Sequence, residues 1–186
     1  MYHEPLSGEE KIIVNQLASE TVKQVQSGAL EPVDVLHAYA KKALKAHDAT
    51  NCLTEVLLPE AEQWAKQCNR QGPLAGMPVS IKDTAGIAGW DACIGYSSWV
   101  GRRVQKDSGL VRLLRDAGAV PLVKTNVPIT LLSLESNNDV FGRTTNPHHK
   151  DYTPGGSTGG EAALLAYGGS RLGIGTDVAG SVRCPA

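Results

Sequence analysis

The glycines of this chain are unevenly distributed, and their positions constrain its fold more than any other feature of the sequence. Residues 1–70 contain only Gly8 and Gly28, so the other 18 of the 20 glycines lie in residues 71–186. Glycine weakens helices but allows tight turns and close approaches of the backbone. The sequence therefore predicts an N-terminal helical layer over residues 1–70 and a separate glycine-rich α/β part over residues 71–186.

Capping and first-turn residues predict three helices in the first part. Ser7 and Glu10 have the spacing of a capping box, and apolar residues follow them at helical intervals. Pro32 and Pro59 suit the first turn of a helix. The predicted elements are a helix over 8–27, a helix from 32 to about 47, a strand within 52–58 and a helix from 59 to about 68.

Short apolar runs alternate with helical patterns in the second part. Met77, Val79 and Ile81 alternate with Ser80 and Lys82, which is typical of a strand with two different faces. The predicted elements are strands over 77–82, 119–123 and 172–175 and helices over 108–117 and 159–167. This alternation predicts an α/β sheet covered by helices.

Charge and composition exclude several classes of partner. The 18 basic and 19 acidic residues give a net charge of −1, without the basic surface that nucleic acid or an anionic membrane requires. The first residues lack a signal-peptide pattern, and no apolar run is long enough to span a membrane. We therefore expect a cytoplasmic protein with no nucleic-acid or membrane partner. We expect no metal site, because the cysteines are widely spaced reduced thiols: Cys52, Cys68, Cys93 and Cys184.

Two serines lie within glycine-rich stretches. Ser157 lies in the run Gly-Gly-Ser-Thr-Gly-Gly at 155–160, and Ser181 follows Gly180 at the end of the run 175–181. Consecutive main-chain N–H groups in such turns can bind an anion or an oxyanion. Tight turns without any ligand are the alternative interpretation.

Familiar nucleophile motifs do not fit these serines. Gly155-x-Ser157-x-Gly159 follows a polar loop instead of a strand, and no histidine follows His149, so it is not the elbow of an α/β-hydrolase. The chain also lacks a Walker A loop and any Ser-x-x-Lys. A serine nucleophile would therefore need another base. Lys82 is the candidate, since burial favours its neutral amine, and an ordinary solvated lysine is the alternative.

Six blocks in this chain resemble the amidase signature family in the same order. They are Gly76–Asp83, Lys124–Pro128, Glu135–Ser136, Phe141–Pro147, Gly155–Glu161 and Gly173–Pro185. The resemblance is dense over 72–186 and looser before it, where the chain is most similar to fungal acetamidase-type members. It implies the amidase-signature fold, a mixed sheet covered by helices, of which the N-terminal portion is present. It also implies a small-molecule amide substrate, no cofactor and no metal, and it allows a homodimer.

The resemblance implies a triad of two serines and a lysine. Ser181 matches the family's nucleophile, Ser157 the bridging serine in a cis peptide after Gly156, and Lys82 the base. In this mechanism the neutral lysine draws a proton through the bridging hydroxyl from the nucleophile.

Residues around this triad match supporting positions of the family. The main-chain N–H groups that match its oxyanion hole belong to Val178, Ala179, Gly180 and Ser181, and Gly156 lines the approach to the bridging serine. Asp177 and Arg183 match a scaffold pair. Ala179 stands where glycine is usual and would be unfavourable at a positive φ, and Thr158 stands where a second serine is usual.

The chain ends five residues after Ser181, whereas the family's domain continues much further. Two hypotheses follow. In the first, the chain is the N-terminal, catalytic-residue-bearing portion of an amide hydrolase. In the second, it is a catalytically inactive, truncated amidase remnant or an interaction fragment.

Overall fold

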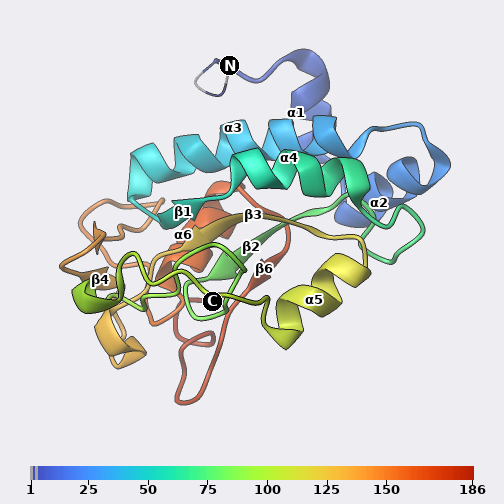
Figure 1. The fold of residues 1–186 in the computed structure, drawn as a ribbon. Coiled ribbons are helices and arrows are strands. Elements are labelled where there is room, and N and C mark those ends of the chain that lie inside the picture. The colour runs from blue at the N-terminus through green and yellow to red at the C-terminus, as the bar shows by residue number, and fades with distance from the viewer. Residues whose placement is uncertain (1, 3) are drawn as a thin grey trace.

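A four-stranded mixed sheet with helices on both faces forms the centre of the protein. The computed structural model describes residue 2 and residues 4–186. Its helices are α1 (Gly8–Asn15), α2 (Ala18–Ser27), α3 (Pro32–Thr50), α4 (Leu58–Gln67), α5 (Gly109–Asp116) and α6 (Gly159–Tyr167). Its strands are β1 (Leu53–Val56), β2 (Pro78–Lys82), β3 (Val120–Thr125), β4 (Asn137–Asn138), β5 (Gly142–Arg143) and β6 (Gly173–Ile174). Figure 1 shows α3 and α4 side by side above the sheet and α5 below it.

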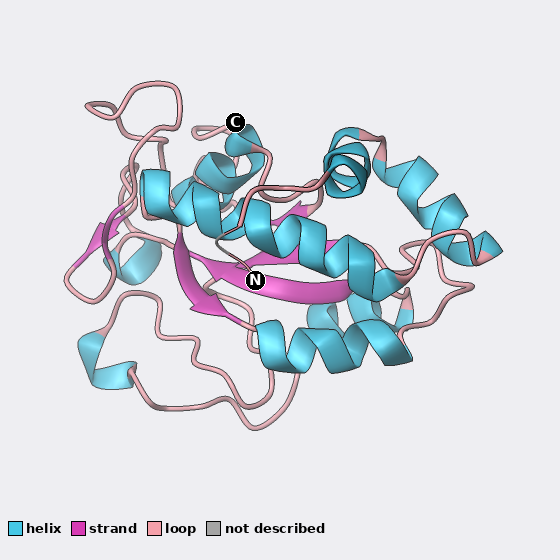
Figure 2. Cartoon of the chain, turned by 90° about the horizontal axis from the view of Figure 1, so that it is seen from above, coloured by secondary structure: helices cyan, strands magenta, loops and turns pink. Residues whose placement is uncertain are grey.

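The order of the main sheet is β1-β3-β2-β6, and β4 and β5 form a separate small hairpin. β2 pairs in parallel with both β3 and β6, whereas β1 pairs antiparallel with β3. The α/β class and the mixed sheet predicted from the sequence are therefore confirmed. In Figure 2 the helices surround this sheet and long loops extend to one side of it.

The predicted helix over 8–27 is wrong, because the chain forms two helices there. Gln16 and Leu17 adopt extended backbone conformations between α1 and α2. The Glu20 carboxylate accepts a hydrogen bond from the Leu17 N–H, which satisfies a donor that the new helix start leaves free. A second capping pattern inside the apolar periodicity therefore separates the helices.

The helix that begins at Pro32 extends three residues beyond the predicted end at His47. Its cap is Asn51, which adopts the left-handed conformation (φ 53°). Asparagine tolerates this conformation better than most residues with a side chain. By contrast, α6 has the predicted bounds and ends at Gly168 (φ 80°).

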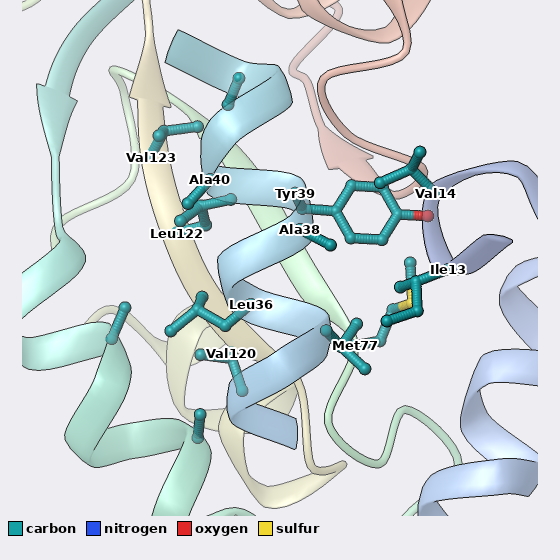
Figure 3. Close-up of a cluster of buried hydrophobic side chains, with 14 of the residues drawn as sticks. Ile13, Val14, Leu36, Ala38, Tyr39, Ala40, Met77, Val120, Leu122 and Val123 are labelled. Atoms are coloured by element: carbon teal, nitrogen blue, oxygen red, sulfur yellow. The ribbon is translucent and has the colours of Figure 1, made fainter. Parts of the chain in front are cut away.

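The hydrophobic core connects the two predicted parts of the chain. Figure 3 shows Leu36 and Ala40 of α3 on the side of Leu122 and Val123 of β3, whereas Tyr39 points to the other side of the helix, toward Val14 of α1. Met77 also belongs to this cluster. This core contains residues from both sides of residue 71. The division of the chain at that residue remains a prediction.

The two faces of β2 have different partners. Val79 and Ile81 pack with Val111 and Leu114 of α5. Met77 was predicted to share their face, but it precedes β2 and packs in the cluster of α3 instead. Burial of all five residues of β2 means that Ser80 and Lys82, on its other face, are also removed from water.

Candidate active site

Three segments distant in sequence meet where β2 ends. Lys82 is the last residue of β2, and β6, which pairs with β2, leads into the turn at 175–181. The segment 155–158 precedes α6, which packs against the sheet. Because β2 and β6 are parallel, the residues that follow β6 emerge at the end of the sheet where Lys82 lies.

Lys82 makes three polar contacts in a buried environment. Its Nζ lies 2.8 Å from Ser157 Oγ, 2.8 Å from Thr158 Oγ1 and 3.1 Å from the carbonyl oxygen of Thr176. Lys82 is only 1% exposed. Burial lowers its pKa from 10.5 to about 8, and the negative charge of Asp177 acts in the opposite direction. A substantial fraction of this amine is therefore neutral near pH 8.

A second buried lysine provides a direct comparison. Lys124 is the neighbour of Ile81 across the β2–β3 ladder, and its Nζ lies 2.6 Å from Asp83 Oδ1 in a fully buried ion pair. Burial raises the pKa of Asp83, and Lys124 lowers it. Lys82 has hydroxyl and carbonyl oxygens as partners where Lys124 has a carboxylate. Of these two lysines, Lys82 is therefore the one suited to lose its proton.

The peptide bond between Gly156 and Ser157 is cis. A Cβ on Gly156 would lie 2.8 Å from main-chain atoms of Glu135 and Leu134, so only glycine fits at this position. The preceding Gly155 has a φ of 88°. Gly156 therefore allows the loop 133–135 to approach the Ser157 segment closely, and Gly155 allows Pro185 to do so, since a Cβ there would lie 2.8 Å from Pro185 Cα.

Ser181 is held beside this segment by its main chain. The N–H of Thr158 donates a hydrogen bond of 3.0 Å to the Ser181 carbonyl. Among the hydrogen bonds of residue 2 and residues 4–186, none involves the Ser181 hydroxyl. The structure thus brings Lys82 and Ser157 into direct contact and places Ser181 next to them through the backbone.

Asp177 organises the turn that carries Ser181. Its carboxylate accepts hydrogen bonds from the N–H groups of Gly180 (2.8 Å), Val182 (2.9 Å) and Arg183 (3.1 Å). The Arg183 guanidinium also donates to both carboxylate oxygens. Arg183, followed by these N–H groups, holds the pKa of Asp177 well below its usual range. The two residues therefore form the pair expected from the sequence, and Asp177 makes the larger set of backbone contacts.

The four predicted oxyanion donors differ in their availability. The Gly180 N–H already donates to Asp177, whereas Val178 and Ala179 are exposed. Within this turn the positive φ is at Gly180 (119°), and not at Ala179. The alanine is therefore compatible with this turn, because its φ does not require glycine.

Several polar residues of the site were not assigned a role from the sequence. The Thr158 hydroxyl donates to the Thr176 carbonyl oxygen at 3.3 Å, beside Lys82. Glu161 and Ser80 form a buried hydrogen bond on the same face of the sheet. The sequence signal that could have pointed to Ser80 and Glu161 was their spacing from the predicted relay residues. Ser80 precedes Lys82 by two residues, and Glu161 follows Ser157 by four.

Neither a metal cluster nor a membrane span is found in the described part of the chain. None of its groups of histidine, cysteine and acidic residues could hold a metal ion. None of its helices is sufficiently long and apolar to cross a bilayer.

Comparisons with known proteins identify the family. A family model described as Amidase matches residues 34–186. The chain is 44% identical to the acetamidase of Aspergillus oryzae over 189 residues, which cover 97% of this chain and 35% of that protein. It is also 44% identical to fatty-acid amide hydrolase 1 of Sus scrofa over 166 residues, which cover 89% of this chain and 28% of that protein.

Solved structures agree with this match. A fatty acid amide hydrolase matches with a TM-score of 0.92 and 35% identity, over 97% of this chain and 33% of that chain. A 6-aminohexanoate cyclic dimer hydrolase matches with a TM-score of 0.86 and 29% identity, over 92% of this chain and 36% of that chain. The protein belongs to the amidase signature family. It spans about a third of the length of these relatives.

Proposed function

We propose that the protein hydrolyses a small carboxamide to a carboxylic acid and ammonia through an acyl-enzyme on Ser181. Lys82 and Ser157 act as its proton relay. The relatives' names, acetamidase and fatty-acid amide hydrolase, support amide hydrolysis. The observation that carries the mechanism is the buried Lys82 amine, whose pKa is about 8, at 2.8 Å from the Ser157 hydroxyl.

The contacts of Lys82 support proton transfer from Ser157 to Lys82. A neutral amine has two N–H donors and one lone pair. The Thr176 carbonyl oxygen can only accept, and the Thr158 hydroxyl donates to that same carbonyl, so both accept an N–H of Lys82. The lone pair is then directed toward Ser157, whose hydroxyl can donate its proton to it.

The reaction proceeds by two acyl transfers. Ser181 Oγ attacks the amide carbonyl carbon while its proton passes to Ser157 and the proton of Ser157 passes to Lys82. Return of a proton through Ser157 to the amide nitrogen breaks the C–N bond and releases ammonia. Water then attacks the acyl-Ser181 ester, loses its proton along the same path, and the carboxylic acid leaves.

Main-chain N–H groups of the Ser181 turn stabilise the oxyanion in this proposal. Val178 and Ala179 are exposed and supply donors directly, and Gly180 contributes when its N–H turns from Asp177 to the substrate. One preorganised donor of this kind contributes about 2.7–4 kcal/mol to stabilising a transition state.

Covalent labelling tests the proposal before the substrate is identified. The protein at its natural length is treated with a fluorophosphonate, and the modified residue is identified by peptide mass spectrometry. We expect modification of Ser181, and loss of labelling in Ser181→Ala and Lys82→Ala. A folded protein that is not labelled contradicts the proposal and supports the inactive remnant. Release of ammonia from a panel of amides then identifies the substrate.

A further inference from the structure

Glu161 is a buried carboxyl group that the proposed relay does not use. It is 2% exposed and lies in the first turn of α6. The Ser80 hydroxyl donates to one of its oxygens, and the Thr125 hydroxyl donates to the other at 2.9 Å. No ion pair within residue 2 and residues 4–186 includes it, and burial raises its pKa to about 7. Burying a carboxyl group without an ion-pair partner is unfavourable for stability. The presence of Glu161 at this position therefore needs an explanation.

Its two partners belong to adjacent parallel strands. Ser80 is in β2 and Thr125 is in β3, and the ladder pairs Thr125 with Lys82. The carboxyl group therefore connects α6 to both strands at the end where the site lies.

β6, the other neighbour of β2, leaves room for this carboxyl group. Ser80 pairs with Gly173 of β6, and a Cβ on Gly173 would lie 2.0 Å from Glu161 Oε1. The absence of a side chain at Gly173 thus lets Glu161 reach between the strands.

These contacts join the two components of the relay. Ser80 lies two residues before Lys82, and Glu161 lies four residues after Ser157. We infer that Glu161 is a positioning residue, which holds Ser157 in contact with Lys82 by bridging α6 to β2 and β3. This inference rests on the proposed function.

Matched substitutions separate this role from a general contribution to folding. Glutamine can keep both bridges, since its Oε1 accepts from Thr125 and its Nε2 donates to Ser80, whose hydroxyl can turn to the Leu172 carbonyl 3.4 Å away. Leucine keeps the volume but makes neither bond. Glu60→Gln, at an exposed position of α4, is the control.

The readout is the rate of fluorophosphonate labelling at Ser181 as a function of pH, in the protein at its natural length. We expect Glu161→Leu to label about 10- to 100-fold more slowly, because a displacement of about 1 Å can reduce a rate 100-fold. We also expect its pH profile to move to higher pH, since looser packing admits water to Lys82 and favours the charged amine. Glu161→Gln and Glu60→Gln should remain within about threefold of the wild type, with an unchanged profile.

Several outcomes overturn the inference. One is a folded Glu161→Leu protein that labels with the wild-type rate and pH profile. Another is a Glu161→Gln protein as slow as Glu161→Leu. If Glu161→Leu does not fold, Ser80→Ala and Thr125→Val each remove one bridge and should each slow labelling about three- to tenfold, and wild-type rates in both overturn the inference.

Lys82→Ala distinguishes this failure from failure of the proposed function. Wild-type labelling in Lys82→Ala contradicts the relay itself. Loss of labelling in Lys82→Ala together with an intact Glu161→Leu contradicts only the role of Glu161.

Discussion

The main-chain N–H of Thr158 donates a hydrogen bond of 3.0 Å to the carbonyl oxygen of Ser181. This bond joins the two glycine-rich segments of the chain directly. The Thr158 side chain also contacts Lys82 Nζ. One residue thereby links the segment of the proposed nucleophile to the lysine.

The first prediction concerns the pH dependence of labelling. Lys82 must be neutral to act as the base, and its pKa is about 8. The labelling rate at Ser181 should therefore rise about tenfold per pH unit below pH 8 and become constant above it. In Lys82→Met, which retains the length of the side chain but not the amine, the rate should fall about 100- to 10,000-fold and lose this dependence.

Equilibrium unfolding gives a second readout of the same group. The folded pKa of Lys82 is about 8 and its ordinary value is 10.5. Between these values the unfolded chain binds more protons, so the Lys82 contribution to the free energy of unfolding should increase as the pH rises from about 8 to 10.5. Lys82→Met should remove this increment. An unchanged slope in that variant would show that the amine is not desolvated.

The second prediction concerns the Thr158 hydroxyl. Thr158→Val keeps the shape of the side chain but removes the acceptor for one N–H of Lys82, which leaves a buried donor without a partner. We expect labelling to slow about tenfold, in line with the loss of about 1–3 kcal/mol for such a group. Thr158→Ser keeps the hydroxyl and should label nearly as fast as the wild type. Equal rates in the two variants would mean that the hydroxyl has no part in the site.

The third prediction compares the two members of the Asp177–Arg183 pair. Asp177 accepts hydrogen bonds from three main-chain N–H groups of the Ser181 turn, whereas the Arg183 side chain contacts only the Asp177 carboxylate within this network. Asp177→Ala should therefore slow labelling at Ser181 much more than Arg183→Ala, by about tenfold or more. Both proteins should unfold at nearly the wild-type temperature, because the turn is exposed. A larger effect of Arg183→Ala would assign the guanidinium a direct role with the substrate.

The fourth prediction concerns two glycines at helix starts. A Cβ on Gly160 in α6 would lie 2.3 Å from the main-chain nitrogen of Asn126 and 2.6 Å from the Cys52 carbonyl oxygen. Gly160→Ala should therefore destabilise the protein by about 1–3 kcal/mol. Gly109 in α5 has nothing within 4 Å of the corresponding position and is the control. Gly109→Ala should be neutral or stabilise by up to about 1 kcal/mol in a denaturant titration, and a larger loss at Gly109 than at Gly160 would contradict the packing.

Local signals in the sequence predicted most of the elements. The residues Gly159 and Tyr167 bound α6 as predicted, and its C-terminal end is set by Gly168, which adopts the left-handed conformation of a helix cap. The break between α1 and α2 was missed, since it depends on the side chain of Glu20 satisfying a backbone donor within a continuous apolar pattern. Competition between two local signals of similar strength is not visible in periodicity alone.

The sequence by itself determined the α/β class, the family resemblance and the three residues proposed for the relay. Short-range patterns carry the α/β class, and the resemblance to the amidase signature family implies the three relay residues. Only the tertiary structure decided that Lys82, unlike Lys124, lacks a carboxylate partner, that the Gly180 N–H is held by Asp177, and that Glu161 reaches both Ser80 and Thr125. The physical reason is that burial and hydrogen-bond partners come from segments distant in the sequence. Lys82 and Thr176, for example, are 94 residues apart, and their contact exists only once the parallel strands pair.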